Sequence, residues 1–284
     1  MTRHPVLSIR TRHIIRSAII FVVLIFFSAI WLLPVYSLLI NSFKSASAVV
    51  STPVLQPAGF SVSAITTVFS QMKQSLLTSL LVVIPVAAIS TFVGAMAAYY
   101  LTLKQSVIND VVFSIIAIAT FVPYQITLVP LTALAVQLGI MNTYYGLIFA
   151  FLVFYLPTGA LLMSIFMAVL PKRTLEAARI DGAGDWLTFR KIVWPLVIPG
   201  AISTFMFIIV ETWNNFFIPL ILTSTPPMRT ASVLVMTYSG SYGSLYNESF
   251  AAALISSLLP LILIVVLGRY FIRGFLALGS GGKG

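Results

Sequence analysis

The chain has 284 residues, of which 60% are hydrophobic and only 8% are charged, against roughly a quarter charged residues in average soluble domains. So few polar groups cannot cover a water-soluble globule, and the net charge of +10 is better explained by membrane orientation than by nucleic-acid binding. Several apolar runs exceed about 18 residues, the length that crosses the hydrocarbon layer, and their continuity excludes a β-barrel. The composition therefore predicts an all-α polytopic membrane protein.

The N-terminal part begins with a basic arm over residues 1–13, followed by an apolar run over residues 14–40. This run is too long for a signal-peptide core, and no small-residue cleavage site follows it, so we expect a retained first span. Residues 41–74 are mixed and polar and contain Pro53 and Gly59, which predicts an external loop.

Residues 75–274 contain the other five predicted spans, which makes six transmembrane helices in all. The five spans run over about 75–103, 111–138, 143–170, 196–222 and 248–271. Pro123 and Pro130 are expected to interrupt the third span of the chain. Ser90, Gly94 and Ala98 recur every four residues and predict a close helix contact.

The distribution of Lys and Arg orients these spans. Of the 16 Lys and Arg residues, all but Lys44, Lys73 and Arg229 fall on the side that becomes cytoplasmic if both termini are cytoplasmic. Residues 275–284 then form a cytoplasmic tail, and residues 223–247 form a second external loop. The same orientation places the polar segment 171–195 in the cytoplasm.

The segment over residues 171–195 is the most polar stretch between the apolar runs. Thr174 is a predicted N-cap, and Glu176 in the first turn suits the helix dipole. Gly182 and Gly184 are expected to break the helix before a second short one. Such a helix either fits a groove on a partner protein or lies at the membrane surface as a cap on the bundle.

The spacing in this segment resembles the EAA loop of ABC importer permeases, in the carbohydrate-uptake branch. Glu176-Ala177-Ala178 is followed after three residues by Gly182, and after nine more by Ile192, one residue and Trp194-Pro195. The usual form ends Ile-x-Leu-Pro, and Trp194 replaces the leucine with the spacing intact. Trp213-Asn214 and the stretch from Gln125 to Pro130 also match, most closely the smaller permease of maltose-type importers.

The resemblance implies a type I importer permease fold, with a peripheral first helix and a five-helix core. It implies as partners a second, different permease, two cytoplasmic ATPase subunits that use ATP and Mg, and an extracytoplasmic binding protein. The coupling residues would be Glu176, Ala177, Ala178, Arg179, Asp181 and Gly182. The resemblance also implies a subunit of a prokaryotic cell membrane. The chain itself has no phosphate-binding Gly-x-x-x-x-Gly-Lys-Ser/Thr loop and no metal-ligand spacing, so we expect that it is not an enzyme and holds no cofactor.

A second polar group lies within the fifth span. Glu211 costs about 2.5 to 3.5 kcal/mol in a membrane on insertion scales, so it should face the bundle interior or water, or be protonated. Aromatic and amide side chains together suit sugar binding, but polar groups can equally hold helices together. The candidate residues of the translocation path are Tyr124, Gln125, Glu211, Trp213, Asn214 and Asn215.

The sequence thus predicts the permease subunit of an ATP-driven importer for a sugar or oligosaccharide. One alternative is an ABC permease for another solute, such as a glycerol phosphate or a polyamine. The other is a proton-coupled carrier that uses Glu211, which leaves the segment over residues 171–195 unexplained. Apart from Arg269 at the cytoplasmic end of the last span, the five predicted spans of the core contain no Lys or Arg, which favours a neutral, hydroxyl-rich substrate over an anionic one.

Overall fold

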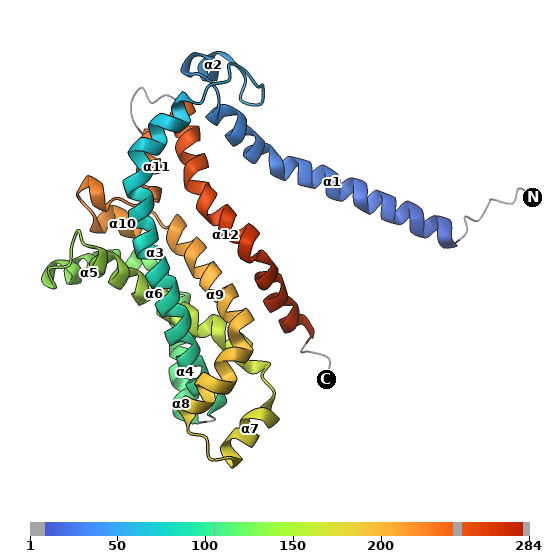
Figure 1. Cartoon of the computed structure of the whole chain (residues 1–284), viewed down its shortest axis with the longest axis vertical. Coiled ribbons are helices and arrows are strands. Elements are labelled where there is room, and N and C mark those ends of the chain that lie inside the picture. Colours follow the sequence, from blue (N-terminus) through green and yellow to red (C-terminus); the bar gives the residue numbers. More distant parts are fainter. Residues whose placement is uncertain (1–8, 105, 241–245, 281–284) are drawn as a thin grey trace, which may run out of the picture. The chain divides into compact units, whose positions relative to one another are not determined.

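The computed structural model describes residues 9–104, 106–240 and 246–280, and Figure 1 shows that they are built from helices. Within these ranges no strand forms beyond an isolated antiparallel bridge between Lys44 and Phe60. The predicted all-α class is therefore confirmed. The first eight residues of the predicted basic arm and the last four of the predicted tail lie outside the described residues.

Among the described residues, five helices are long and apolar enough to cross a membrane. They are residues 15–42 of α1 (Ile9–Ser42), α3 (Ser63–Leu103), α6 (Tyr144–Ala168), the helical path Asp185–Asn214, and residues 246–268 of α12 (Tyr246–Ser280). A sixth span arises if the pair α4 (Val107–Thr120) and α5 (Tyr124–Gln137) crosses together, with a bend of 97° between them. This pair occupies the place of the predicted third span.

Prolines act differently at two points of this bent pair. Pro123 has an extended ψ of 116° and directly precedes α5, so the helix is broken there as predicted. Pro130 lies inside α5, so the interruption predicted at this residue is wrong. A proline has no N–H, so it leaves one carbonyl of the preceding turn without its helical hydrogen bond. Helices at membrane depth tolerate this because neighbouring groups can donate a hydrogen bond to that carbonyl.

The structure divides into two compact units, and each is described by itself. The first unit comprises residues 1–68 and 242–254. In it, Ser45 caps α2 (Ala46–Ser51) by accepting a hydrogen bond from the Ala48 N–H. Lys44 is fully buried and donates from Nζ to the Pro53 carbonyl at 3.0 Å.

Residues 41–74, predicted as an external loop, contain α2 and the beginning of α3. The first turns of α3 are helical because Ala64, Val68 and Met72 recur every four residues and are all at most 2% exposed. The predicted second span began at Ser75, twelve residues after the observed start of the helix at Ser63.

The second unit comprises residues 69–241 and 255–284 and holds the helical bundle (Figure 1). In it α6 packs against α4 and α9 (Trp194–Asn214). The close contact predicted for Ser90, Gly94 and Ala98 is confirmed, because a Cβ on Gly94 would lie 2.4 Å from the Gly159 carbonyl carbon. A Cβ on Gly159 would lie 2.2 Å from the Ser90 carbonyl oxygen.

The second predicted loop, over residues 223–247, also contains helices: the 3-10 turn Pro226–Met228 and α11 (Ala231–Gly240). Several hydrogen bonds hold it against α3, among them two near the 3-10 turn. The Thr78 hydroxyl donates to the Pro227 carbonyl, and the Ala231 N–H donates to the Ser79 hydroxyl, each at 2.8 Å. These hydrogen bonds join residues that are 149 and 152 positions apart in the chain, so the local sequence did not predict the helices in this segment.

Candidate functional site

The predicted polar segment folds as two short helices, α7 (Lys172–Ile180) and α8 (Asp185–Thr188), joined by a turn. Gly182 has φ +75°, a conformation that side chains disfavour, and its turn lets the Ala183 N–H donate to the Ala178 carbonyl at 3.0 Å. The predicted glycine break is confirmed. The predicted N-cap at Thr174 is wrong, because α7 begins two residues earlier, directly after Pro171.

Helix α7 has a buried side and an exposed side. Leu175 and Ala178 are 8% and 5% exposed and face the body of the second unit. Glu176, Ala177 and Asp181 are exposed, and Ile180 is 85% exposed. Arg179 lies on α7, but its side chain is outside the described part of the structure. The exposed side therefore presents small, acidic and apolar groups to the surroundings.

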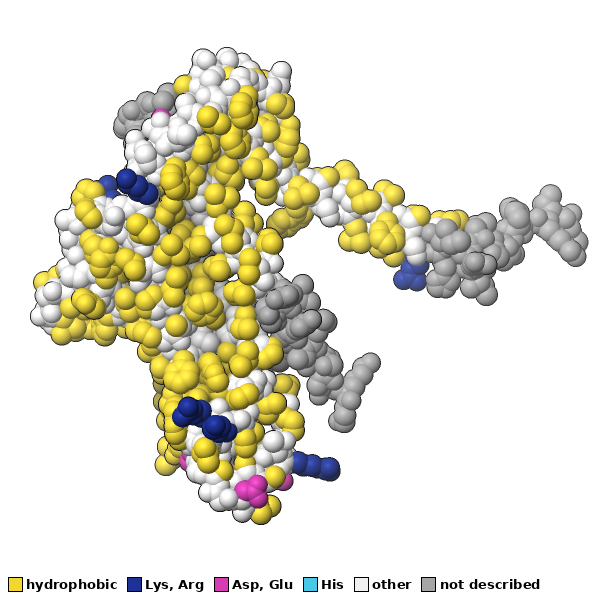
Figure 2. Space-filling model, viewed as in Figure 1, with side chains coloured by type: hydrophobic (Ala, Val, Ile, Leu, Met, Phe, Trp, Pro, Cys, Tyr) yellow, Lys and Arg dark blue, Asp and Glu magenta, His cyan; other side chains and the backbone are white. Residues whose placement is uncertain are grey.

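The segment is anchored to the bundle by an ion pair and by apolar packing. Lys104, directly after α3, places Nζ 2.5 Å from Oδ2 of Asp185, the first residue of α8. The hydrogen bond and the charge of Asp185 raise the pKa of Lys104 above its ordinary value. Leu175 joins the apolar cluster beneath α7. In Figure 2, charged side chains gather at the end of the second unit that carries α7 and α8.

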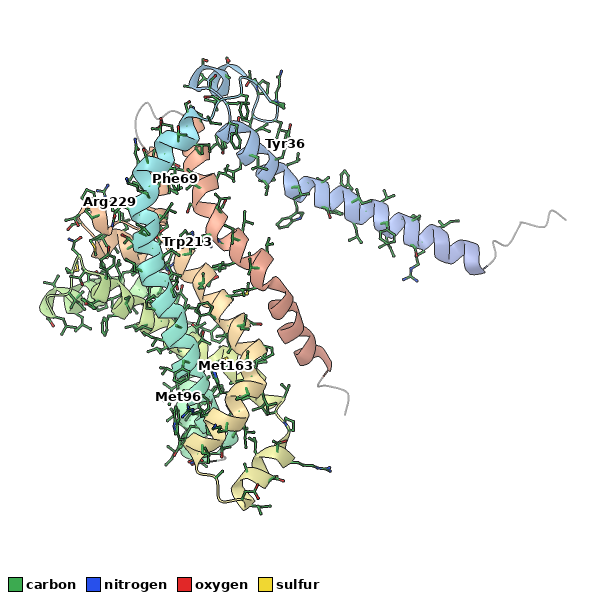
Figure 3. The ribbon with its side chains drawn as sticks, in the orientation of Figure 1. Tyr36, Phe69, Met96, Met163, Trp213 and Arg229 are labelled. Carbon is green, nitrogen blue, oxygen red and sulfur yellow. The ribbon has the colours of Figure 1, made fainter. Side chains whose placement is uncertain are left out.

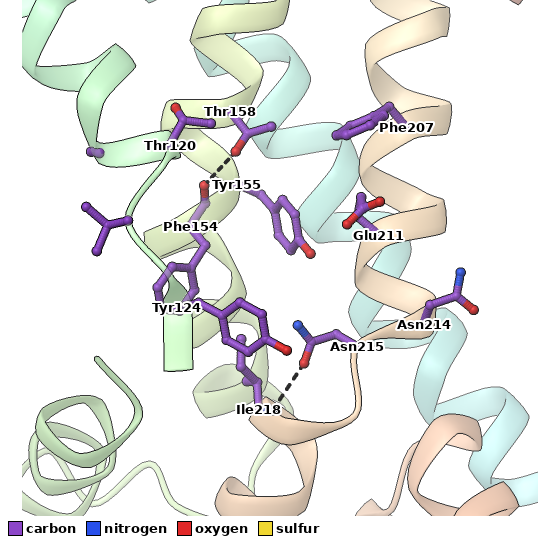
Figure 4. Close-up of a pocket in the computed structure, with 12 residues that line it drawn as sticks. Thr120, Tyr124, Phe154, Tyr155, Thr158, Phe207, Glu211, Asn214, Asn215 and Ile218 are labelled. Carbon is purple, nitrogen blue, oxygen red and sulfur yellow. Dashed lines mark hydrogen bonds between the residues drawn. The ribbon is translucent and has the colours of Figure 1, made fainter. Parts of the chain in front are cut away.

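A cavity of about 360 Å³ lies within the second unit (Figure 4). It is bordered by the end of α4, the link to α5, α6, α9 and the link to α10 (Phe217–Leu222). Its lining residues are Ala119, Thr120, Val122, Tyr124, Phe154, Tyr155, Thr158, Phe207, Glu211, Asn214, Asn215 and Ile218. Residues that are far apart in the sequence therefore meet around one space.

The polar part of the cavity comes from α4, α5, α6, α9 and the link to α10. Figure 4 shows Tyr155 and Glu211 facing one another across it, with the Tyr124 ring near Asn215. Helix α9 ends at Asn214 because Asn215 has extended backbone angles, and the Asn215 Oδ1 accepts a hydrogen bond from the Ile218 N–H at 3.1 Å. This cap at the start of α10 fixes the amide at the rim of the cavity.

The structure brings together four of the six predicted path residues: Tyr124, Glu211, Asn214 and Asn215. Gln125 is exposed and does not line the cavity. Trp213, labelled in Figure 3, is 3% exposed, and its Nε1–H donates to the Ser256 carbonyl of α12 at 3.0 Å. Its indole thus packs between helices and does not face the cavity.

Sequence reasoning missed Tyr155 and Thr158, which line the cavity from α6. These two residues flank Pro157, so a signal was present: polar side chains beside a proline at membrane depth, the same pattern that identified Tyr124. Among the 12 lining residues, Glu211 is the charged one. The lining offers carboxylate, phenol, amide and hydroxyl groups beside aromatic rings, a set suited to hydrogen-bonding a hydroxylated ligand.

Comparison with known proteins shows a match to the family model described as "Binding-protein-dependent transport system inner membrane component" over residues 90–276. The chain is 51% identical over 283 residues to the glucose import system permease protein GlcU of Saccharolobus solfataricus, covering 97% of this chain and 99% of that protein. It is 27% identical over 272 residues to the diacetylchitobiose uptake system permease protein NgcG of Streptomyces coelicolor, covering 93% and 88%.

A crystal structure of a bacterial ABC transporter that imports the acidic polysaccharide alginate contains a chain with a similar fold. The TM-score is 0.75 at 20% identity, and the match covers 94% of this chain and 100% of that one. At this identity the likeness concerns the fold alone. It agrees with the type I importer permease fold expected from the sequence.

Proposed function

The chain belongs to the family of binding-protein-dependent transport system inner membrane components, and from that premise we propose that it is the permease subunit of an ATP-driven sugar importer. The observation that carries this proposal is the 51% identity, over nearly the whole of both chains, to a protein named for glucose import. The ABC permease predicted from the residue spacing at Glu176, Gly182 and Pro195 is confirmed at the level of the family.

We propose glucose, or a sugar close to it, as the substrate. Glucose and diacetylchitobiose, for which these related permeases are named, are both neutral and built on hydroxyl-rich rings. The cavity suits such a ring because Tyr124, Tyr155 and Asn215 offer hydrogen bonds without a lysine or arginine among the lining residues. A phosphorylated solute would meet the Glu211 carboxylate and no cation there, which disfavours a glycerol phosphate.

The proposed assembly contains a second permease, two ATPase subunits that bind ATP and Mg, and an extracytoplasmic binding protein. In it, the exposed side of α7 fits a groove on one ATPase subunit, with Glu176 facing a basic group. Residues 171–195 are then the coupling loop, and both termini lie in the cytoplasm. Residues 14–40 form a peripheral span and residues 75–274 the permease core. ATP hydrolysis belongs to the partner subunits, and this chain binds no cofactor.

The proposed mechanism follows from the course of the chain between the coupling loop and the cavity. Closure of the ATPase dimer displaces α7, and the helical path from Asp185 to Asn214 connects α8 with the cavity-lining end of α9. Packed helices switch between discrete arrangements because their interfaces deform little. The cavity would therefore open alternately to the two sides of the membrane.

The proposal is tested with the complete transporter reconstituted in proteoliposomes. Glu176→Lys reverses an exposed charge, and Gly182→Val places a β-branched residue at φ +75°. Both variants should insert normally and lose sugar uptake, whereas Asp110→Lys, a charge reversal on α4, should keep it. Normal coupling of ATP hydrolysis to uptake in both coupling-loop variants would refute the assignment. Uptake that is competed by a polyamine and not by glucose would refute the substrate.

A further inference from the structure

The last part of the proposed coupling loop contains a π turn, Phe189–Val193, between α8 and α9. There the Trp194 N–H donates to the Phe189 carbonyl, five residues back instead of four. A π turn inserts an extra residue into a helix, and such turns occur frequently at functional sites. This one lies between Asp185 in the coupling loop and Glu211 in the cavity.

Phe189 lies at the centre of an aromatic cluster. Its side chain is 3% exposed, and its ring centroid lies 6.1 Å from that of Phe92 and 5.6 Å from that of Tyr99, both on α3. The rings of Trp186 on α8 and Trp194 on α9 lie at 5.9 and 6.0 Å. All four distances fall in the range of favourable ring pairs. One side chain therefore contacts the helices on both sides of the π turn and a third helix, α3.

Phe189 also belongs to an apolar cluster that supports the inner side of α7. It comprises Ala95, Ala98, Tyr99, Met163, Phe166, Met167, Leu175, Phe189, Val193, Val197 and Ala201. Leu175 is the contribution of α7, and Met163 and Phe166 come from α6. A close-packed interior transmits displacement because it compresses little. Leu175 of α7 and Phe189 therefore belong to one close-packed cluster.

We propose that Phe189 is a positioning residue for coupling: its ring joins α3 to the π turn, so that displacement of α7 moves α3 and α9 together. The cavity end of α9, with Glu211 and Asn214, then follows the coupling loop. The π turn supplies the local freedom, because its hydrogen bonding departs from that of the flanking helices. This inference rests on the proposed coupling role of α7 and adds the element that carries its movement inward.

The test compares Phe189→Leu with the unchanged transporter in proteoliposomes that contain glucose-loaded binding protein. Three quantities are measured: the ATPase subunits that co-purify, the rate of ATP hydrolysis, and the glucose taken up per ATP hydrolysed. We expect assembly and hydrolysis to persist and uptake per ATP to fall about tenfold, within the 5–150-fold range of typical coupling between sites. Phe189→Tyr keeps the ring and should restore most of the ratio.

Leu147→Ala is the control for lost packing, because Leu147 is fully buried in α6 and lies outside both the aromatic cluster and the cavity. It should lower the melting temperature and leave uptake per ATP unchanged. An equal loss of this ratio in Leu147→Ala, or loss of the ATPase subunits from Phe189→Leu, would make Phe189 a packing residue only and overturn the inference.

The outcome also separates this inference from the proposed function. If Phe189→Leu keeps uptake per ATP while Glu176→Lys loses it, the coupling role of α7 stands and the role of Phe189 is refuted. If Glu176→Lys keeps uptake per ATP as well, the coupling role of α7 itself is refuted.

Discussion

Lys104 Nζ lies 2.5 Å from Asp185 Oδ2 and joins the residue after α3 to the first residue of α8. The two residues are separated by 81 positions in the chain. The ion pair spans the same two elements that Phe189 connects through Phe92, Tyr99 and Trp186. The coupling loop is thus tied to α3 by charge at its exposed side and by aromatic packing at its buried side.

Reversing one charge of this pair should weaken coupling. Lys104→Glu places a carboxylate beside Asp185, so we expect uptake per ATP to fall, by a few-fold at most because the pair is solvent-exposed. Asp185→Lys combined with Lys104→Glu restores opposite charges and should restore the ratio. A double variant no better than the single one would show that the pair plays no part in coupling.

The pH dependence of this pair follows from the raised pKa of Lys104. A lysine whose folded pKa is raised contributes stability that is fully present below its ordinary value of 10.5 and is lost as the pH rises through the folded value. Between about pH 6 and 9 the lysine therefore stays charged in both states. The ratio of uptake between Lys104→Glu and the unchanged protein should stay constant across this range; a ratio that varies across it would contradict the prediction.

The contact between α3 and α6 should not tolerate a methyl group. Gly94→Ala and Gly159→Ala each place a Cβ within 2.4 Å of backbone atoms of the facing helix. Overpacking of this kind costs about 1–3 kcal/mol, so the melting temperature of the purified complex should fall. Gly268→Ala on α12 is the matched control, since a Cβ there meets nothing within 4 Å. Equal melting temperatures for all three variants would contradict the close contact.

Asn142 should be replaceable by aspartate but not by alanine. Its φ is +56°, and its Oδ1 accepts hydrogen bonds from Ser224 N at 2.9 Å and from Thr225 N and Oγ1, each at 3.1 Å. Asn142→Ala removes this shared acceptor, and we expect a loss of about 1–3 kcal/mol in the free energy of unfolding. Asn142→Asp keeps an acceptor and should change thermal unfolding little. Similar unfolding of both variants would show that the acceptor is unimportant.

Substitutions of cavity residues should change the KM for sugar uptake, whereas substitution of Trp213 should change thermal stability. Glu211→Gln and Tyr155→Phe should raise the KM for sugar uptake by roughly 2- to 12-fold, equivalent to a hydrogen bond of about 0.5–1.5 kcal/mol. Trp213→Phe removes the donor to the Ser256 carbonyl and should lower the melting temperature without changing KM. The opposite pattern, with KM changed by Trp213→Phe alone, would place substrate at Trp213 and refute the cavity as the sugar site.

Several features could be predicted from the sequence because they depend on local composition and spacing. Long apolar runs predicted the membrane helices, and Gly182 predicted the turn between α7 and α8 because few residues tolerate φ +75°. Pro123 predicted the break before α5, although the 97° bend did not follow from it. Helix ends were less well predicted, since the start of α3 depends on burial of Ala64 and Val68.

By itself, the sequence determined the class of protein, the family and the glycine turn between α7 and α8, since each follows from residues close together in the chain. The tertiary structure alone decided that Tyr155 shares a cavity with Glu211, that Trp213 packs against α12, and that Phe189 lies among four rings. These relations join residues on different helices. They depend on how side chains fit together when the helices pack, which spacing along the chain does not specify.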